Sequence, residues 1–190
     1  MITIKLKLTE NVKIQNYLQQ YNNVVHVAYN RWVDGLSQSN IEKYIKNKIN
    51  NIDLLDASFI KAAVDQARSL KDKPKVIFGG KNNWDKYNKG LITKQQYLEN
   101  KYNSPLMVRG STQDNKGNRK FQIDMENNQI IFKPKCKTKI CAKLPKTKYD
   151  QTLKLLQQKC EDGETFFTCR INNEYIWIIF DETILRKEKF

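Results

Sequence analysis

The sequence predicts an α+β protein in which a β-rich domain is interrupted, after its first strand, by a bundle of helices. Three observations predict this fold class. The chain opens on an apolar and polar alternation at 2–8, apolar residues then recur at helical spacing to about residue 71, and strand-like segments return only after residue 118. Since a lone strand cannot bury its apolar face, the first strand must find its sheet partners more than about 100 residues later.

The N-terminal elements follow from the spacing of apolar residues. Even positions within 2–8 are Ile or Leu and share one strand face. Residues 10–36 carry apolar side chains at gaps of three, one and four, which is typical of one helix face, and Thr9 stands where an N-cap belongs. Two more amphipathic helices are predicted at 39–52 and 54–71, and three helices of this spacing pack as a small bundle.

Proline and glycine interrupt the apolar pattern between 71 and 119, so most of this segment is predicted as loop. Thr93 and Gln96 form a capping box that opens one short helix within it. The remaining predicted elements are a hairpin at 121–133, a strand at 139–144, a helix at 149–160, a hairpin formed by 166–171 and 175–180, and a frayed tail at 186–190.

This order of elements divides the chain into three parts, and no internal repeat relates them. Residues 1–9 and 118–185 form the predicted β-rich domain. Residues 10–72 form the helical insert, and residues 73–117 form a basic, loop-rich connector with one short helix.

Positive charge is concentrated in the middle of the chain. The protein has 34 Lys and Arg against 20 Asp and Glu, a formal net charge of +14. Residues 71–148 contain 19 of the basic residues and 6 of the acidic ones, whereas the rest of the chain contains 15 and 14. A coding bias toward lysine would raise lysine everywhere, so the regional excess favours an anionic partner.

Composition also argues against several protein classes. No apolar run approaches the roughly 20 residues of a membrane span, and the N-terminus lacks the apolar core of a secretory signal. We therefore expect a cytoplasmic protein with no membrane partner. The four cysteines, Cys136, Cys141, Cys160 and Cys169, match no common zinc spacing and are interpreted as buried or idle thiols, so no metal and no cofactor is expected.

Groups suited to catalysis are few and scattered. His26, the single histidine, lies among the aromatic residues of the first helix and is interpreted as a packed or partly exposed side chain rather than a general base. Asp181 and Glu182 follow the last strand, where a solvated turn explains them. The segment 79–81, Gly-Gly-Lys, lacks the spacing of a phosphate-binding P-loop. The sequence therefore predicts no catalytic residues and no enzyme.

Nucleic-acid contacts are better supported, because the basic region also carries aromatic side chains. Lysine and arginine neutralise phosphates, and aromatic rings stack on unpaired bases. Trp84 and Phe121 fit a place in the core equally well, and that alternative stays open. Lys133 opens a run of alternating lysines along a strand, which is costly unless solvent or an anion lies opposite. The candidates are Lys75, Lys81, Trp84, Lys86, Tyr87, Lys89, Tyr102, Arg109, Arg119, Lys120 and Lys133.

Several short segments also follow one another in an informative order. They are Gln15 and Tyr29-Asn30-Arg31-Trp32 in the first helix, then AAVDQARSL at 62–70, IFGGK at 77–81, GNRKF at 117–121, IFK at 131–133 and the closing strand pair. With the opening strand, this order resembles the N-terminal half of TnpB-type proteins, the transposon-encoded RNA-guided DNA nucleases related to type V CRISPR effectors. The resemblance covers nearly the whole chain.

The resemblance implies a wedge-like antiparallel β-barrel with a helical recognition lobe inserted after its first strand. It implies basic surfaces that hold structured guide RNA and the guide-target heteroduplex, and it adds Tyr29, Asn30 and Arg31 to the candidate contacts. The RuvC-like nuclease of that family has no counterpart in this sequence, because Asp181 lacks the Asp-x-Gly context.

We therefore expect a non-catalytic nucleic-acid-binding module from a bacterial, phage or mobile-element setting. Its expected partners are structured RNA, adjacent DNA and a nuclease subunit or effector protein. Three alternatives stay open: an interaction protein of a phage or mobile element that mimics or regulates an RNA-guided effector, one piece of a split or truncated nuclease, and a true nuclease.

Overall fold

A computed structural model describes residues 1–49 and 54–185 of the chain, which divides into two compact units. The sheet unit consists of Met1–Lys13 and the chain from Met107 onward, and the helical unit consists of Ile14–Leu106. Ile52 of the predicted second helix and the predicted tail at 186–190 lie outside the described residues. Helices and antiparallel sheets both contribute, which confirms the predicted α+β class.

Two antiparallel sheets build the sheet unit. The first strand pairs with the last, from Ile2 opposite Phe180 to Lys7 opposite Tyr175, which confirms that its partner lies far along the chain. The four-stranded sheet has the order β1 (Ile2–Lys7), β7 (Tyr175–Phe180), β6 (Phe167–Ile171) and β2 (Leu106–Arg109), and the three-stranded sheet has the order β3 (Phe121–Asp124), β4 (Gln129–Lys135) and β5 (Thr138–Lys143).

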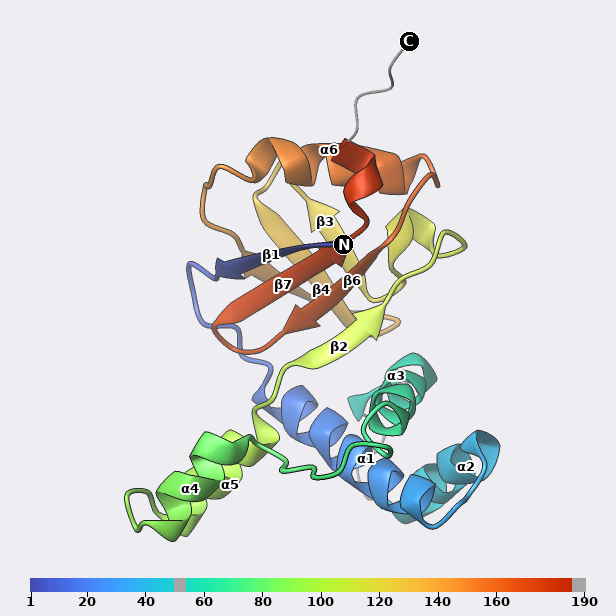
Figure 1. Ribbon diagram of the computed structural model, residues 1–190. Helices are drawn as coiled ribbons and strands as arrows, with labels where there is room; N and C mark the ends of the chain where they lie inside the picture. The colour runs from blue at the N-terminus through green and yellow to red at the C-terminus, as the bar shows by residue number, and fades with distance from the viewer. Residues whose placement is uncertain (50–53, 186–190) are drawn as a thin grey trace. The chain divides into compact units, whose positions relative to one another are not determined.

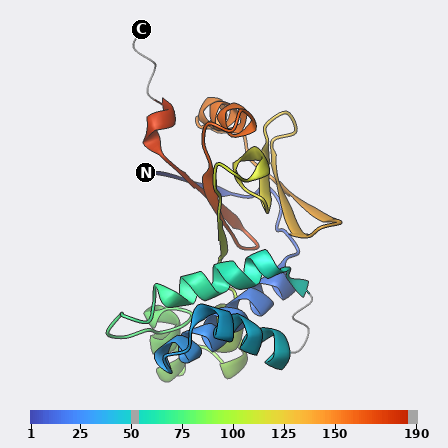
Figure 2. The same cartoon turned by 90° about the vertical axis from the view of Figure 1, so that its right-hand side faces the viewer.

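The core of this unit lies between the sheets and under one helix. Strand residues alternate between buried and accessible, as a half-buried sheet requires. Figure 2 shows the sheets from the side, with α6 (Asp150–Glu161) over one end of them. From α6, Leu153, Leu156 and Cys160 are buried with the inward residues of both sheets, among which Phe121 stacks on Phe132 at 5.1 Å between ring centroids.

The barrel expected from the resemblance is wrong for the described residues, because the sheets do not close on each other. Between the end of β1 and β5, the backbone makes a hydrogen bond from Thr9 N to Lys143 O at 3.2 Å, but no ladder continues it. On the other side, β2 and β3 are four-residue strands separated by a loop containing a 3₁₀ turn at Asn115–Gly117. Strands this short, interrupted by that loop, leave a two-sheet arrangement instead.

Three helices pack together in the helical unit, as the apolar spacing predicted (Figure 1). They are α1 (Gln15–Val33), α2 (Gln38–Lys48) and α3 (Ala57–Arg68). The phenol of Tyr21 on α1 donates to Gln66 Oε1 of α3 at 2.8 Å, and the indole of Trp32 donates to Val64 O at 3.0 Å. Among the described residues, no helix combines the length and apolar character needed to cross a membrane.

The predicted N-cap at Thr9 is wrong. Helix α1 begins at Gln15 after Ile14, whose side chain makes no capping bond. The reason lies in the preceding residues, which bond to the turn between β6 and β7: Leu8 N donates to Glu174 O at 2.7 Å and Val12 N to Asn173 O at 2.9 Å. These bonds hold residues 8–12 in a non-helical conformation, so the helix starts only at Gln15.

The segment predicted as mostly loop contains two helices, α4 (Lys81–Asn88) and α5 (Lys94–Tyr102), followed by β2. The capping box of α5 is confirmed, since Thr93 Oγ1 accepts from Gln96 N and Gln96 Oε1 accepts from Thr93 N. Helix α4 escaped prediction because it has no buried residue and therefore no apolar stripe.

Candidate nucleic-acid interface

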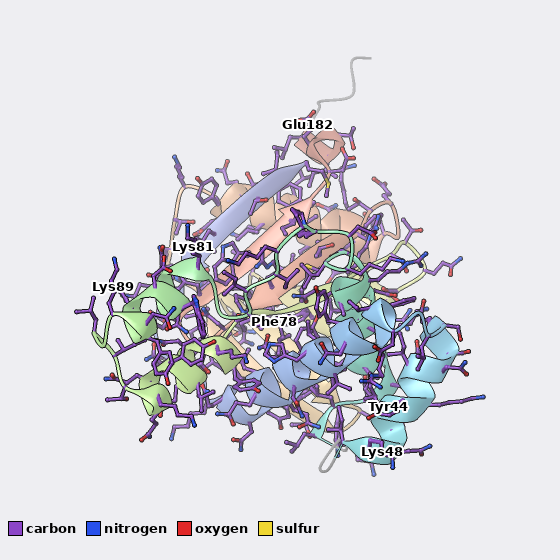
Figure 3. All side chains as sticks on the ribbon, turned by 60° about the horizontal axis from the view of Figure 1, so that its bottom comes forward. Tyr44, Lys48, Phe78, Lys81, Lys89 and Glu182 are labelled. Atoms are coloured by element: carbon purple, nitrogen blue, oxygen red, sulfur yellow. The ribbon has the colours of Figure 1, made fainter. Side chains whose placement is uncertain are left out.

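Helix α4 brings four of the predicted contacts together. Lys81 is its first residue, after Gly80, and Trp84, Lys86 and Tyr87 lie within the helix. Figure 3 shows Lys81 and Lys89 at the two ends of α4. Because the helix is only eight residues long, its cations and rings all lie within about 12 Å along one axis.

An aromatic cluster fastens α4 to α5. The rings of Tyr87 and Tyr97 stack at 4.9 Å between centroids, and Trp84 lies 5.7 Å from Tyr97. Trp84 nevertheless keeps 40% of its surface exposed, whereas Phe121 is fully buried in the sheet unit. The alternative left open by the sequence is thus resolved differently for the two residues: Phe121 belongs to the core, and Trp84 presents ring surface to solvent.

The contacts added by the resemblance lie at the end of α1, and two of them are already engaged. The ring of Tyr29 meets Phe78 edge-on at 5.4 Å between centroids. Arg31 forms an ion pair with Asp34 at 3.1 Å, and its guanidinium lies 5.1 Å from the Tyr44 ring. Asn30 is exposed. An incoming phosphate would therefore compete with Asp34 for Arg31.

His26 lies in the same part of the helical unit and is packed as the sequence predicted. Its ring lies 3.9 Å from the Phe78 ring and 5.1 Å from the Tyr102 ring, between centroids. Burial, and secondarily the charge of Lys101, lower its pKa from 6.5 to about 4. The imidazole is therefore neutral near pH 7 and contributes no positive charge to the basic surface.

The two glycines before α4 shape the loop that carries Phe78. Gly79 and Gly80 both have positive φ, at 82° and 87°. A Cβ at Gly79 would lie 2.6 Å from the Cα of Lys101, whereas nothing lies within 4 Å of a Cβ at Gly80. Gly79 thus permits close packing of the loop against α5. The glycines have a structural role here, and the sequence around them has no P-loop spacing.

A second group of cations lies on the hairpin of β4 and β5 in the sheet unit. Cys136 and Lys137 form the two-residue turn, with Lys135 opposite Thr138. Lys133 and Lys139 lie near the irregularity between Phe132 and Lys135, and Lys133 Nζ donates to Gln122 Oε1 at 3.2 Å.

Like charges affect one another on this hairpin. The pKa of Lys133 is lowered by burial first, and then by the positive charges of Lys139 and Lys116. The pKa of Lys120 is lowered by burial, and Lys133 adds to the effect. Such mutual repulsion destabilises the unliganded sheet and would be relieved by an anion.

Arg119 and Lys120, two of the candidate phosphate contacts, both interact with the surrounding fold. Arg119 Nε forms an ion pair at 2.9 Å with Asp114, whose side chain is only 6% exposed. Lys120 is buried, with 9% of its surface exposed. Arg109, at the end of β2, is exposed. The ion pair of Arg119 and the burial of Lys120 therefore make both side chains less available to a phosphate than Arg109.

Asn118 holds the backbone next to Arg119 and Lys120 in place, and the sequence pattern did not identify it. It is buried, its Nδ2 donates to Val108 O and Phe167 O, and its Oδ1 accepts from the backbone N–H groups of Lys120 and Phe121. One side chain therefore joins β2, β6 and the start of β3. A lone Asn in a turn-rich segment is too common for its spacing to reveal such a role.

Sequence reasoning also missed a row of side chains on the outward face of the four-stranded sheet. Lys5 lies opposite Trp177, and Trp177 lies opposite Arg170. Lys5 Nζ is 4.4 Å from the centroid of the Tyr175 ring and 5.4 Å from that of Trp177, and the Arg170 guanidinium is 5.6 Å from the Trp177 ring. The signal that could have found them is the alternation of the two strands, which places odd positions outward in both.

Most of the predicted cations have no carboxylate partner. In residues 71–148, ion pairs involve Lys116 with Glu161 and Arg119 with Asp114. Throughout 1–49 and 54–185, none involves the following lysines: Lys75, Lys81, Lys86, Lys89, Lys133, Lys135, Lys137 and Lys139. The first four belong to the helical unit and the last four to the sheet unit.

The residues considered for other chemistry are placed as follows. Burial raises the pKa of Cys160 to about 12 and raises the pKa of Cys169 well above 9.0, so neither thiol ionises near neutral pH, while Cys136 and Cys141 are exposed. Asp181 accepts from Thr183 N at 2.8 Å in a turn. Across the described ranges, His, Cys, Asp and Glu side chains form no group of three or more suited to a metal ion.

The fold and its cations define a two-unit α+β protein with lysine-rich, acid-poor segments in each unit. The chain belongs to the family described as the SSO2105 N-terminal domain, whose model matches residues 1–172. The name of that family states no activity, and no curated protein matches the chain.

Proposed function

We propose that this protein is a nucleic-acid-binding module that holds structured, guide-like RNA and adjacent DNA and is non-catalytic by itself. The proposal extends the resemblance to the wedge and recognition parts of TnpB-like effectors, without a closed barrel. The observation that carries it is a set of lysines with no carboxylate partner among residues 1–49 and 54–185. They lie on α4 and on the segments next to it, and on the β4 and β5 hairpin.

Unpaired lysines support a polyanionic ligand for a physical reason. Clustered cations without carboxylates repel one another. The pKa of Lys133 is lowered first by burial and then by the charges of Lys139 and Lys116, so repulsion is one part of that shift. A phosphate backbone reduces that repulsion and releases its own counterions when it binds. The affinity therefore decreases as the salt concentration rises. Exposed Trp84 lies on the same helix as Lys81 and Lys86 and adds a ring on which an unpaired base can stack.

The test is a titration of the purified chain against a labelled, structured RNA at several salt concentrations. The wild type is compared with the double variant Lys133→Gln/Lys139→Gln. The matched control is Lys13→Gln/Lys154→Gln, which removes the same charge from exposed positions of the same unit outside 71–148. We expect the hairpin variant to bind more weakly and to lose roughly 0.7–0.9 of salt slope for each phosphate contact removed.

Two outcomes contradict the proposal. No binding at low salt removes the function altogether. Equal losses in the hairpin variant and the control show that overall charge, rather than a defined surface, attracts the RNA. In a pull-down with this protein from a host that carries an RNA-guided effector, recovery of the effector after ribonuclease treatment would instead favour the interaction protein that mimics an effector. Metal-dependent DNA cleavage by the purified chain would overturn the non-catalytic assignment.

A further inference from the structure

The outward face of the four-stranded sheet combines cations with aromatic rings outside the lysine-rich middle of the chain. Figure 1 looks onto this face, with β1, β7, β6 and β2 side by side in front of the other sheet. Across three strands, Lys5, Trp177 and Arg170 form one row, and Lys7 lies opposite Tyr175 in the next.

The opposite face of these strands packs into the core, and that core is filled without the outward rings. Ile4 and Leu6 of β1 and Ile176 and Ile178 of β7 are buried, while Lys5 and Lys7 are exposed and Tyr175 and Trp177 are half-buried. The two half-buried rings therefore lie outside the core and keep part of their surface accessible.

The charge on this face has one sign. Strands β1, β7, β6 and β2 contain no Asp or Glu, whereas they contain Lys5, Lys7, Arg109 and Arg170. Arg109 is exposed and follows buried Val108 at the end of β2. An occupant of this face must therefore carry negative charge and, to use the rings, flat unsaturated groups.

We propose that this sheet face binds unpaired nucleotides of a single-stranded nucleic acid. Bases stack on Tyr175, Trp177 or the Arg170 guanidinium, and Lys5 and Lys7 neutralise the phosphates between them. The bases of a duplex are already stacked inside it, so only unpaired bases reach rings on a sheet surface. This inference rests on the proposed function and assigns to it a second surface, distinct in residues and in preferred ligand from the hairpin lysines.

The experiment compares a labelled oligouridylate with an RNA duplex of the same length, both titrated by fluorescence anisotropy. The variant Tyr175→Ile/Trp177→Ile removes both rings and keeps residues that favour strands. Trp177→Phe retains a ring at the central position, and Ile179→Val changes the next outward residue of β7 without touching a ring. Circular dichroism and the denaturation midpoint establish that each variant is folded.

We expect the double isoleucine variant to bind the oligouridylate at least about fivefold more weakly and to bind the duplex as the wild type does. Trp177→Phe should retain most of the affinity, and Ile179→Val all of it. Unchanged oligouridylate binding by the folded double variant would overturn the sheet-face site while leaving the proposed function intact. Equal loss for oligouridylate and duplex would also overturn it, because stacking would not be the cause. If the wild type binds neither RNA, the proposed function fails and this inference fails with it.

Discussion

The ring of His26 lies 3.9 Å from the ring of Phe78, centroid to centroid, inside the helical unit. Burial, followed by the charge of Lys101, lowers the pKa of His26 from 6.5 to about 4. The native state therefore binds fewer protons than the unfolded state in this interval, so the stabilisation is fully present above about pH 6.5 and is lost as the pH falls toward 4.

We expect the free energy of unfolding to decrease between pH 7 and pH 5 with a steeper slope in the wild type than in His26→Gln. Denaturant titrations of the two proteins at matched pH values measure this, and the comparison cancels the carboxylates that both share. Parallel curves for the two proteins would show that His26 does not couple stability to pH.

The adjacent glycines Gly79 and Gly80 offer a matched pair of substitutions. Both need positive φ, so an alanine at either is strained, but only the Cβ at position 79 would meet the backbone of Lys101, at 2.6 Å. We expect Gly79→Ala to lower the free energy of unfolding by about 2 kcal/mol more than Gly80→Ala. Equal effects, measured by denaturant unfolding, would mean that the loop does not pack closely against α5.

Asn118 is expected to be among the most sensitive polar positions of the sheet unit. Its removal leaves two buried carbonyl groups and two backbone N–H groups without the bonds that it makes. We expect Asn118→Ala to reduce the free energy of unfolding by about 3 kcal/mol, and the exposed control Asn11→Ala to change it by less than about 0.5 kcal/mol. A loss below 1 kcal/mol for Asn118→Ala would contradict the structural role.

Lys139 should show opposite effects on stability and on binding. The pKa of Lys133 is lowered by burial first and then by the charge of Lys139, so Lys139→Gln should raise the free energy of unfolding by a few tenths of a kcal/mol. The same substitution should weaken RNA binding, because a phosphate contact is lost. Thermal denaturation and salt-dependent titration of one variant test both effects, and a variant that is both less stable and unchanged in binding would refute this explanation.

Most of the regular elements were predictable because each carries a local pattern. Strand β1 and helix α1 each bury one face, so apolar residues recur at the spacing of a strand in β1 and at the spacing of a helix in α1. The capping box of α5 needs only Thr93 and Gln96, three residues apart. Pairing of β1 with β7 followed from the need of an amphipathic strand for partners.

The remaining features depend on contacts between segments distant in sequence. Helix α4 is held by Tyr97 of α5, and the start of α1 is delayed by bonds to the turn after β6. Closure of a barrel depends on strand lengths and on the loop at 110–120, which a resemblance between short segments does not determine.

The same limits apply to the candidate site. Exposure of Lys81 and Lys86 could be predicted from their polar surroundings, but the partner of Arg119 and the burial of Lys120 depend on how the loop at 110–120 folds. Lys5 and Trp177 become neighbours only through the register of β1 and β7, so a count of charges along the chain could not find them.

The pairing of β1 with β7 has a consequence for the order in which the protein forms on the ribosome. Helices of the helical unit come from one continuous stretch, Ile14–Leu106, and can assemble while later residues are still being translated. Strand β1 is translated before the helical unit and before β7, so its Ile and Leu side chains stay without their sheet partner until Phe180 has left the exit tunnel. The nascent chain therefore carries an unpaired apolar strand until the residues as far as β7 have been translated, and an unpaired strand edge is prone to aggregation during that interval.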